Sequence, residues 1–256
     1  MGGQSSRDQA SSFGAGAAVY AKSRPSYPRE AIRWLVPSAA RKVLDLGAGS
    51  GQLTRGLLEL DCDVVAVEPS DGMRAEFVRA LPEVPILPGR AESIPVDDDS
   101  VDAVVVAQAW HWVDVDAAIP ELNRVLRDGG QLGLVWNIRD EREPWVAELG
   151  RIMRQSTELD MNSETPYVGP PFEPIERQDF EWICPMTRSG LLDLVASRSY
   201  ILTLEPPARQ QVLNAVSDLL NTHPALTERA DIHLPYVTRC SRTRLVTIRG
   251  SASTPS

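Results

Sequence analysis

The sequence predicts an α/β fold in which a doubly wound, mostly parallel sheet is covered by helices on both faces. Apolar runs typical of strands alternate with helical stretches between residues 42 and 137, which is the alternation that builds parallel sheets. The run from Val104 to Ala107 has no polar residue in it, so both faces of that strand must be buried. The 256 residues suffice for one large domain with a well-buried core.

The elements follow in order along the chain. Pro120 would break the interior of a helix, so we expect the helix after Trp112 to begin close to it. Gly129 and Gly130 supply a left-handed stop before the next strand. The predicted strands are 42–46, 63–68, 101–107 and 131–137, and the predicted helices are 29–36, 51–60, 71–80 and 119–126.

Beyond residue 140 the alternation weakens. A stretch rich in Pro and Gly, residues 162–176, predicts a long loop. The other elements expected in this part are helices at 143–159, 188–197 and 206–221 and strands at 178–186 and 233–245.

A glycine turn in the first half of the chain predicts a nucleotide cofactor. Gly47, Gly49 and Gly51 follow a buried strand, allow a sharp turn and leave no side chain where a cofactor must approach. We expect the backbone N–H groups of this turn to face the amino-acid part of the cofactor. Position 52, where dinucleotide enzymes carry a third glycine, holds Gln52, which disfavours an NAD-dependent oxidoreductase.

Two acids refine the choice of cofactor. Asp45 falls at the end of the first strand, where a carboxylate opposes a pyrophosphate but suits the ammonium of an amino-acid-like ligand. Glu68 ends the second strand, where a carboxylate can accept both ribose hydroxyls, with ligand and water as its partners. A surface acid is the alternative interpretation of Glu68. Together the two acids indicate S-adenosylmethionine.

Four blocks of sequence occur in the order and spacing of one family. They resemble the class I S-adenosylmethionine-dependent methyltransferases, and within them the small-molecule branch of methyltransferase type 11 and trans-aconitate methyltransferase-like proteins. The resemblance implies a seven-stranded Rossmann-like sandwich that transfers a methyl group to a small molecule without a metal. The blocks are VLDLGAGSGQLT (43–54), VVAVEPS (64–70), GRAESIPVDDDSVDAVVVAQAWHW (89–112) and RVLRDGGQLGLVWNIRD (124–140).

The resemblance also implies how the chain is organised. We expect tails at 1–16 and 250–256 and a single domain at 17–249. Within that domain, residues 38–140 would hold the cofactor and residues 141–245 would form a helical cap over the substrate.

Ligands of such sheets bind beyond the carboxyl ends of the strands, which directs attention to the sequence after residue 107. Gln108 is expected beside the sulfonium, with Trp110, His111 and Trp112 as the walls of the pocket. An aromatic face attracts a cation by about 0.5–2 kcal/mol. His111 is either a general base or a hydrogen-bonding loop residue, and Trp112 is either pocket wall or core.

Other candidates come from three further loops. Arg139 can clamp an anionic substrate or form a solvated pair with Asp140. In the resembled family the segment with Tyr20 and Arg24 folds over the cofactor, so Arg24 would meet the methionine carboxylate; a simple turn is the alternative.

The loop at residues 89–92 departs from the family. Arg90 stands where many relatives carry Asp near the adenine. The backbone of Ala91 or the carboxylate of Glu92 can serve instead, and a helix-capping role for Glu92 is equally open.

Composition limits the partners. The net charge of −9, without a basic stripe, disfavours nucleic acid. Three widely separated cysteines support neither a disulfide framework nor a zinc site, which predicts a cytoplasmic protein. The lack of a long apolar run predicts that it binds no membrane. We also expect a monomer or homodimer. With only three histidines, candidate bases are scarce, which favours a carboxylic acid as acceptor. A non-catalytic cofactor-binding scaffold or regulator remains the alternative.

Overall fold

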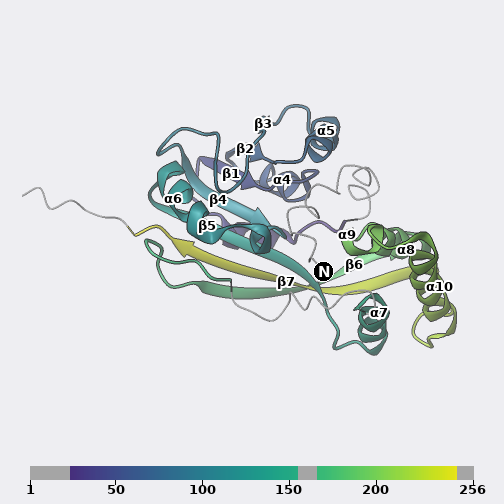
Figure 1. Cartoon of the computed structure of the whole chain (residues 1–256). Coiled ribbons are helices and arrows are strands. Elements are labelled where there is room, and N and C mark those ends of the chain that lie inside the picture. Colours follow the sequence, from purple (N-terminus) through teal and green to yellow (C-terminus); the bar gives the residue numbers. More distant parts are fainter. Residues whose placement is uncertain (1–23, 155–165, 247–256) are drawn as a thin grey trace, which may run out of the picture.

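The computed structural model describes residues 24–154 and 166–246 (Figure 1). Within these ranges one sheet of seven strands has the order β3-β2-β1-β4-β5-β7-β6. The first five strands pair in parallel, whereas β7 is antiparallel to both β5 and β6. This confirms the doubly wound, mostly parallel sheet. The strands are β1 (Lys42–Leu46), β2 (Asp63–Val67), β3 (Ile86–Leu87), β4 (Val101–Ala107), β5 (Leu126–Arg139), β6 (Glu176–Thr187) and β7 (Asp231–Arg244).

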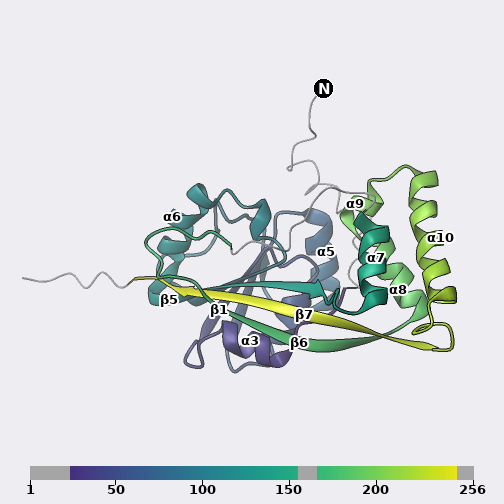
Figure 2. The ribbon, with the colours of Figure 1, turned by 90° about the horizontal axis from the view of Figure 1, so that it is seen from below.

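Helices cover both faces of the parallel strands. One face packs against α3 (Arg29–Leu35), α4 (Gln52–Leu57) and α5 (Asp71–Ala80), and the other against α6 (Val115–Val125), so α3 and α6 lie on opposite sides of the sheet (Figure 2). Consecutive residues of β4 point into the two different cores, Val104 towards α6 and Val105 towards α3. The uninterrupted apolar run of β4 is thereby explained.

A third apolar core holds the remaining helices at one end of the sheet, where β5, β6 and β7 extend past the other strands (Figure 1). Tyr236 of β7 packs there with Val146, Leu191 and Leu220 from three helices. The predicted helices and strands of this part are present, and α9 was not predicted. The helices are α7 (Pro144–Arg154), α8 (Arg188–Ala196), α9 (Ser199–Leu202) and α10 (Pro206–Thr222).

The expectation that Pro120 lies near the start of its helix is wrong. Helix α6 begins five residues earlier, at Val115, because the Asp114 carboxylate accepts the N–H of Ala117 at 3.3 Å and caps it. Pro120 has no N–H group to donate to the carbonyl of Asp116, so the helix loses one hydrogen bond in its first turn. Burial of the apolar face of α6 outweighs that loss.

The expected left-handed glycine is present at Gly129, but the expectation that the fifth strand begins after it is wrong. Strand β5 begins at Leu126, directly after α6, and Gly129 with φ of +71° lies inside it. The pairing of β5 with β4 shifts its register between Val101 and Ala103. The glycines therefore belong to an irregular stretch of the strand.

Candidate active site

The glycine turn follows β1, and glycine is needed at its positions for different structural reasons. Gly47, Gly49 and Gly51 adopt φ of +74°, +56° and +86°, which side chains disfavour. A Cβ atom on Gly51 would lie 2.6 Å from the side chain of Leu81, so Gly51 is needed for packing. A Cβ atom on Gly49 would meet no protein atom within 4 Å. Gly49 therefore borders open space that a ligand can fill.

Most N–H groups of the turn already have partners, contrary to expectation. Gly47 and Ala48 both donate to the carbonyl of Val67, at 2.8 and 3.1 Å, and Gly51 donates to Ala48 at 2.9 Å. These bonds hold the turn against β2. The turn consequently offers a ligand close approach more than hydrogen-bond donors.

Glu68 lies at the end of β2, as predicted, but ligand and water are not its only partners. Its carboxylate accepts the N–H of Gly49 and the N–H of Ser70, each at 2.9 Å. Only 7% of the residue is exposed, and this burial raises the pKa of Glu68 while the two N–H groups oppose the rise. Since a carboxylate has about four acceptor positions, Glu68 can fasten the turn and still receive ribose hydroxyls.

Asp45 lies behind the glycine turn. Its carboxylate is fully buried and accepts the hydroxyl of Thr54 at 2.5 Å, and burial raises the pKa of Asp45 to about 7. In the part of the chain that the structure describes, Asp45 lines neither of the cavities described below. Asp45 is therefore not placed for the direct contact with an ammonium group that the sequence suggested.

A cavity of about 770 Å³ opens beside Gly49, and several of the predicted residues line it. Glu68, Ala91 and Glu92 line it together, from β2 and the loop after β3. Glu92 also accepts the N–H of Asp114 at 2.9 Å, and Asp114 is the cap residue of α6. Glu92 therefore contacts the cap of α6, as the capping alternative expected, and also lines the cavity.

The aromatic residues after β4 form a 3₁₀ turn, Trp110–Trp112, whose side chains point in different directions. Trp110 is 4% exposed, lies in the core and donates its Nε1–H to the carbonyl of Tyr167 at 3.1 Å. The prediction that Trp110 walls the pocket is wrong, because a turn of three residues cannot aim three successive side chains at one cavity. His111 and Trp112 line the larger cavity, with ring centroids 4.6 Å apart.

His111 is a poor candidate for a general base. Surrounding protein atoms lower the pKa of His111 to about 4 by desolvation, although the residue keeps an exposed surface at the cavity mouth. The imidazole is neutral at pH 7 and is only a weak proton acceptor.

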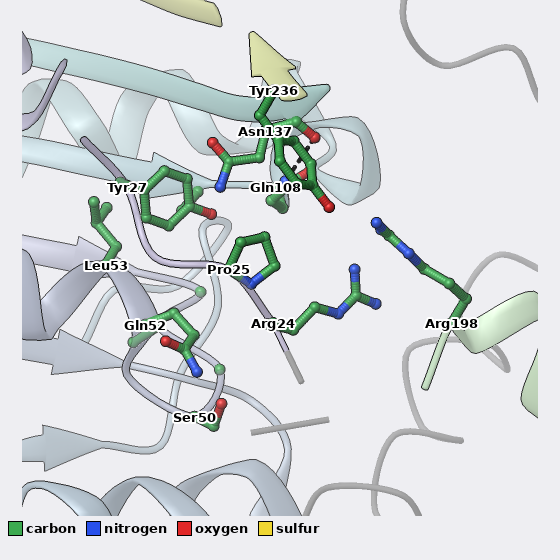
Figure 3. A pocket seen from close by; sticks show the side chains of 14 residues that line it. Arg24, Pro25, Tyr27, Ser50, Gln52, Leu53, Gln108, Asn137, Arg198 and Tyr236 are labelled. Atoms are coloured by element: carbon green, nitrogen blue, oxygen red, sulfur yellow. Dashed lines mark hydrogen bonds between the residues drawn. The ribbon is translucent and has the colours of Figure 1, made fainter. Parts of the chain in front are cut away.

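A smaller cavity of about 60 Å³ lies on the other side of the glycine turn (Figure 3). Gln108 lines both cavities, has φ of +57° and donates from Nε2 to the carbonyl of Asn137 at 3.3 Å. Gln108 therefore lies where the two cavities meet, and its position beside the sulfonium stays a prediction. Arg24 lines the smaller cavity as well, whereas Tyr20 lies outside the described residues.

Two residues of the smaller cavity escaped the sequence analysis, Arg198 and Tyr236. Arg198 lies between α8 and α9, and nothing in its sequence context distinguishes it. Tyr236 pairs with Arg139 across β7 and β5. The predicted solvated pair of Arg139 and Asp140 is absent within the described ranges, since Asp140 pairs with Arg142 at 2.6 Å.

Known proteins were compared with the chain. Residues 44–134 match the family described as Methyltransferase domain. An uncharacterized methyltransferase of Mycobacterium tuberculosis is 52% identical over 241 residues, which cover 94% of this chain and 98% of that protein. The chain is a class I S-adenosylmethionine-dependent methyltransferase.

Other comparisons place this methyltransferase more broadly. A solved structure assigned as a type II methyltransferase of Anaeromyxobacter dehalogenans is 26% identical, with a TM-score of 0.67 over 87% of this chain and 98% of that chain. The malonyl-[acyl-carrier protein] O-methyltransferase of Methylococcus capsulatus is 38% identical over 109 residues, 40% of this chain and 38% of that protein. Among the described residues, no helix is long and apolar enough to span a membrane.

Proposed function

We propose that this methyltransferase transfers the methyl group of S-adenosylmethionine to a carboxylate oxygen of a small acid. The observation that carries the proposal is the lining of the smaller cavity, which within the described ranges includes no Asp, Glu, His, Lys or Cys. Apart from two arginines, the titratable residues of that lining are Tyr27 and Tyr236, and a phenol, whose ordinary pKa is about 10, is a poor base at pH 7. A carboxylate is ionised at pH 7 and needs no base, unlike most hydroxyl acceptors.

The residues fit the cofactor in size and chemistry. Space beside Gly49 runs from the larger cavity, where Glu68 can accept ribose hydroxyls and Ala91 borders the base, to Arg24 in the smaller one. We assign Arg24 to the methionine carboxylate. S-adenosylmethionine, when bound, supplies a methyl group on a cationic sulfonium.

The protein contributes position and exclusion of water. Gln108 is held by the carbonyl of Asn137, whose side chain in turn donates to the carbonyl of Ser26 and accepts the hydroxyl of Thr238. Such a fixed wall can orient an acceptor whose oxygen bonds to the methyl carbon as the carbon–sulfur bond breaks, yielding a methyl ester and S-adenosylhomocysteine. The Methylococcus relative is named as an O-methyltransferase of a malonyl group on a carrier protein, and because a malonyl group has a free carboxylate, that name supports this class of chemistry. In this proposal residues 141–245 cover the acceptor.

The chemical stability of the product tests the proposal. The enzyme would be incubated with methyl-labelled S-adenosylmethionine and a metabolite extract, and the labelled products treated with mild alkali. Carboxyl methyl esters release labelled methanol, so we expect volatile label. Label that stays in an alkali-stable product would show an ether, amine or carbon acceptor and overturn the proposal.

A further inference from the structure

We propose that Arg139, Arg198 and Tyr236 form a binding site for the carboxylate of the acceptor, distinct from Arg24 on the cofactor side. The identity of the anion as the acceptor rests on the proposed function. A carboxylate held here by one oxygen would leave its second oxygen free to face Gln108, which lines the same cavity.

The side chains of Arg198 and Tyr236 border one cavity, and Arg139, which is not among the residues that line it, is the strand partner of Tyr236. In Figure 3 the guanidinium of Arg198 and the hydroxyl of Tyr236 point towards each other, with the guanidinium of Arg24 below them. They come from the cap, from β7 and from the segment before α3. The cavity of about 60 Å³ exceeds the roughly 10–15 Å³ that one water molecule needs, so it can admit a small polar group.

Buried polar atoms at this place lack partners. Tyr236 is 1% exposed, and its hydroxyl forms no hydrogen bond with any described residue. The same holds, among described residues, for the buried Nε atoms of Arg139 and Arg198. An unpaired buried donor lowers the stability of the fold, so three in one place indicate that something other than the described chain completes the site.

The positive charges of Arg139 and Arg198 also favour the binding of an anion. Burial lowers the pKa of Arg139, and repulsion by Arg198 lowers it further. Glu141 opposes the repulsion, but it is the weakest of the influences on Arg139. The exposed Arg142, by contrast, pairs with both Asp140 and Glu181 at 2.6 Å. Two guanidiniums that repel each other, with only a weak influence from an acid among the described residues, are typical of a site for a planar anion.

The test uses the full-length enzyme saturated with S-adenosylhomocysteine, in buffer with a bulky, weakly binding anion. Acetate, benzoate and succinate are titrated calorimetrically, with succinamide as the uncharged counterpart of succinate. We expect at least one carboxylate to bind and succinamide not to bind. Arg198→Met should weaken that binding at least tenfold and Arg198→Lys by nearly as much, because an ammonium lacks the planar fork. Arg142→Met, with the same loss of charge, should leave it within twofold.

Two further measurements separate binding from structure. Arg198→Met should raise the melting temperature in the absence of carboxylate, because it removes the repulsion on Arg139, and its affinity for S-adenosylhomocysteine should stay within threefold of the wild type. A lower melting temperature in both Arg198 variants would make Arg198 structural and overturn the inference, as would a wild-type complex that binds no carboxylate. Carboxylate binding that depends on Arg198, in an enzyme that forms no methyl ester, would instead leave this inference standing and contradict only the proposed function.

Discussion

Replacing Glu68 by Gln should weaken both the fold and the binding of cofactor. The carboxylate accepts two N–H groups, from Gly49 and Ser70, whereas an amide has one oxygen and turns an N–H₂ group towards the second donor. A hydrogen bond to a charged group contributes about 1.5–3 kcal/mol. Relief of the buried charge offsets part of this, so we expect a net loss of about 1–2 kcal/mol and a melting temperature lower by roughly 2–8 °C.

Binding should fall further, because the ribose also loses an acceptor. A loss of about 1.4–3 kcal/mol corresponds to a dissociation constant for S-adenosylhomocysteine raised roughly 10- to 150-fold. Calorimetric titration and thermal melting measure the two effects on the same protein, and Glu83→Gln, at an exposed site, controls for charge. Unchanged binding together with a lower melting temperature would refute a role of Glu68 in the cofactor site.

Three other predictions follow from the geometry. Gly49→Ala should weaken S-adenosylhomocysteine binding at least tenfold and lower the free energy of unfolding by about 1 kcal/mol, because its φ of +56° strains a side chain; Gly51→Ala, which adds a contact with Leu81 to the same kind of strain, should lower it by about 2–3 kcal/mol and change binding less. Calorimetry and chemical denaturation measure the two effects, and equal losses of binding at both positions would contradict their distinct roles. Trp110→Phe should destabilise the protein by about 1–3 kcal/mol, whereas Trp112→Phe should change the affinity for the cofactor and leave the melting temperature nearly constant. The reverse pattern would support the sequence-based prediction that Trp110 lines the pocket. The pKa of His111 is lowered to about 4, so its imidazole stays neutral from pH 8 to pH 6 and kcat/KM should lose no activity to its protonation in that range; an acid limb near pH 6.5 that disappears in His111→Gln would show His111 to be a base.

Local pattern predicted most strands and helices between residues 42 and 137, although not the short strand β3. The run in β4 demanded burial on two faces, and the glycine turn demanded backbone that only glycine adopts readily. Pro120 misled because capping by Asp114 and burial of α6 outweigh one lost hydrogen bond. Such a balance depends on tertiary contacts that local pattern does not contain.

The site was predictable to the extent that strand ends determine it. Glu68 and Gln108 follow strands directly and line the cavities as expected. Arg198 lies between α8 and α9 and Tyr236 lies on the antiparallel strand β7, and their place beside the glycine turn depends on long-range contacts such as the pairing of β7 with β5. The direction of Trp110 depended on a single 3₁₀ turn, which the sequence did not indicate.

The structure of the enzyme bound to S-adenosylhomocysteine and to a carboxylate identified by titration tests the central claim most directly. The account predicts that the methionine carboxylate contacts Arg24, that the ribose contacts Glu68, and that the added carboxylate lies between Arg198 and Tyr236, near Gln108. If the methionine carboxylate itself occupied the position between Arg198 and Tyr236, the division between cofactor and acceptor sites would be contradicted.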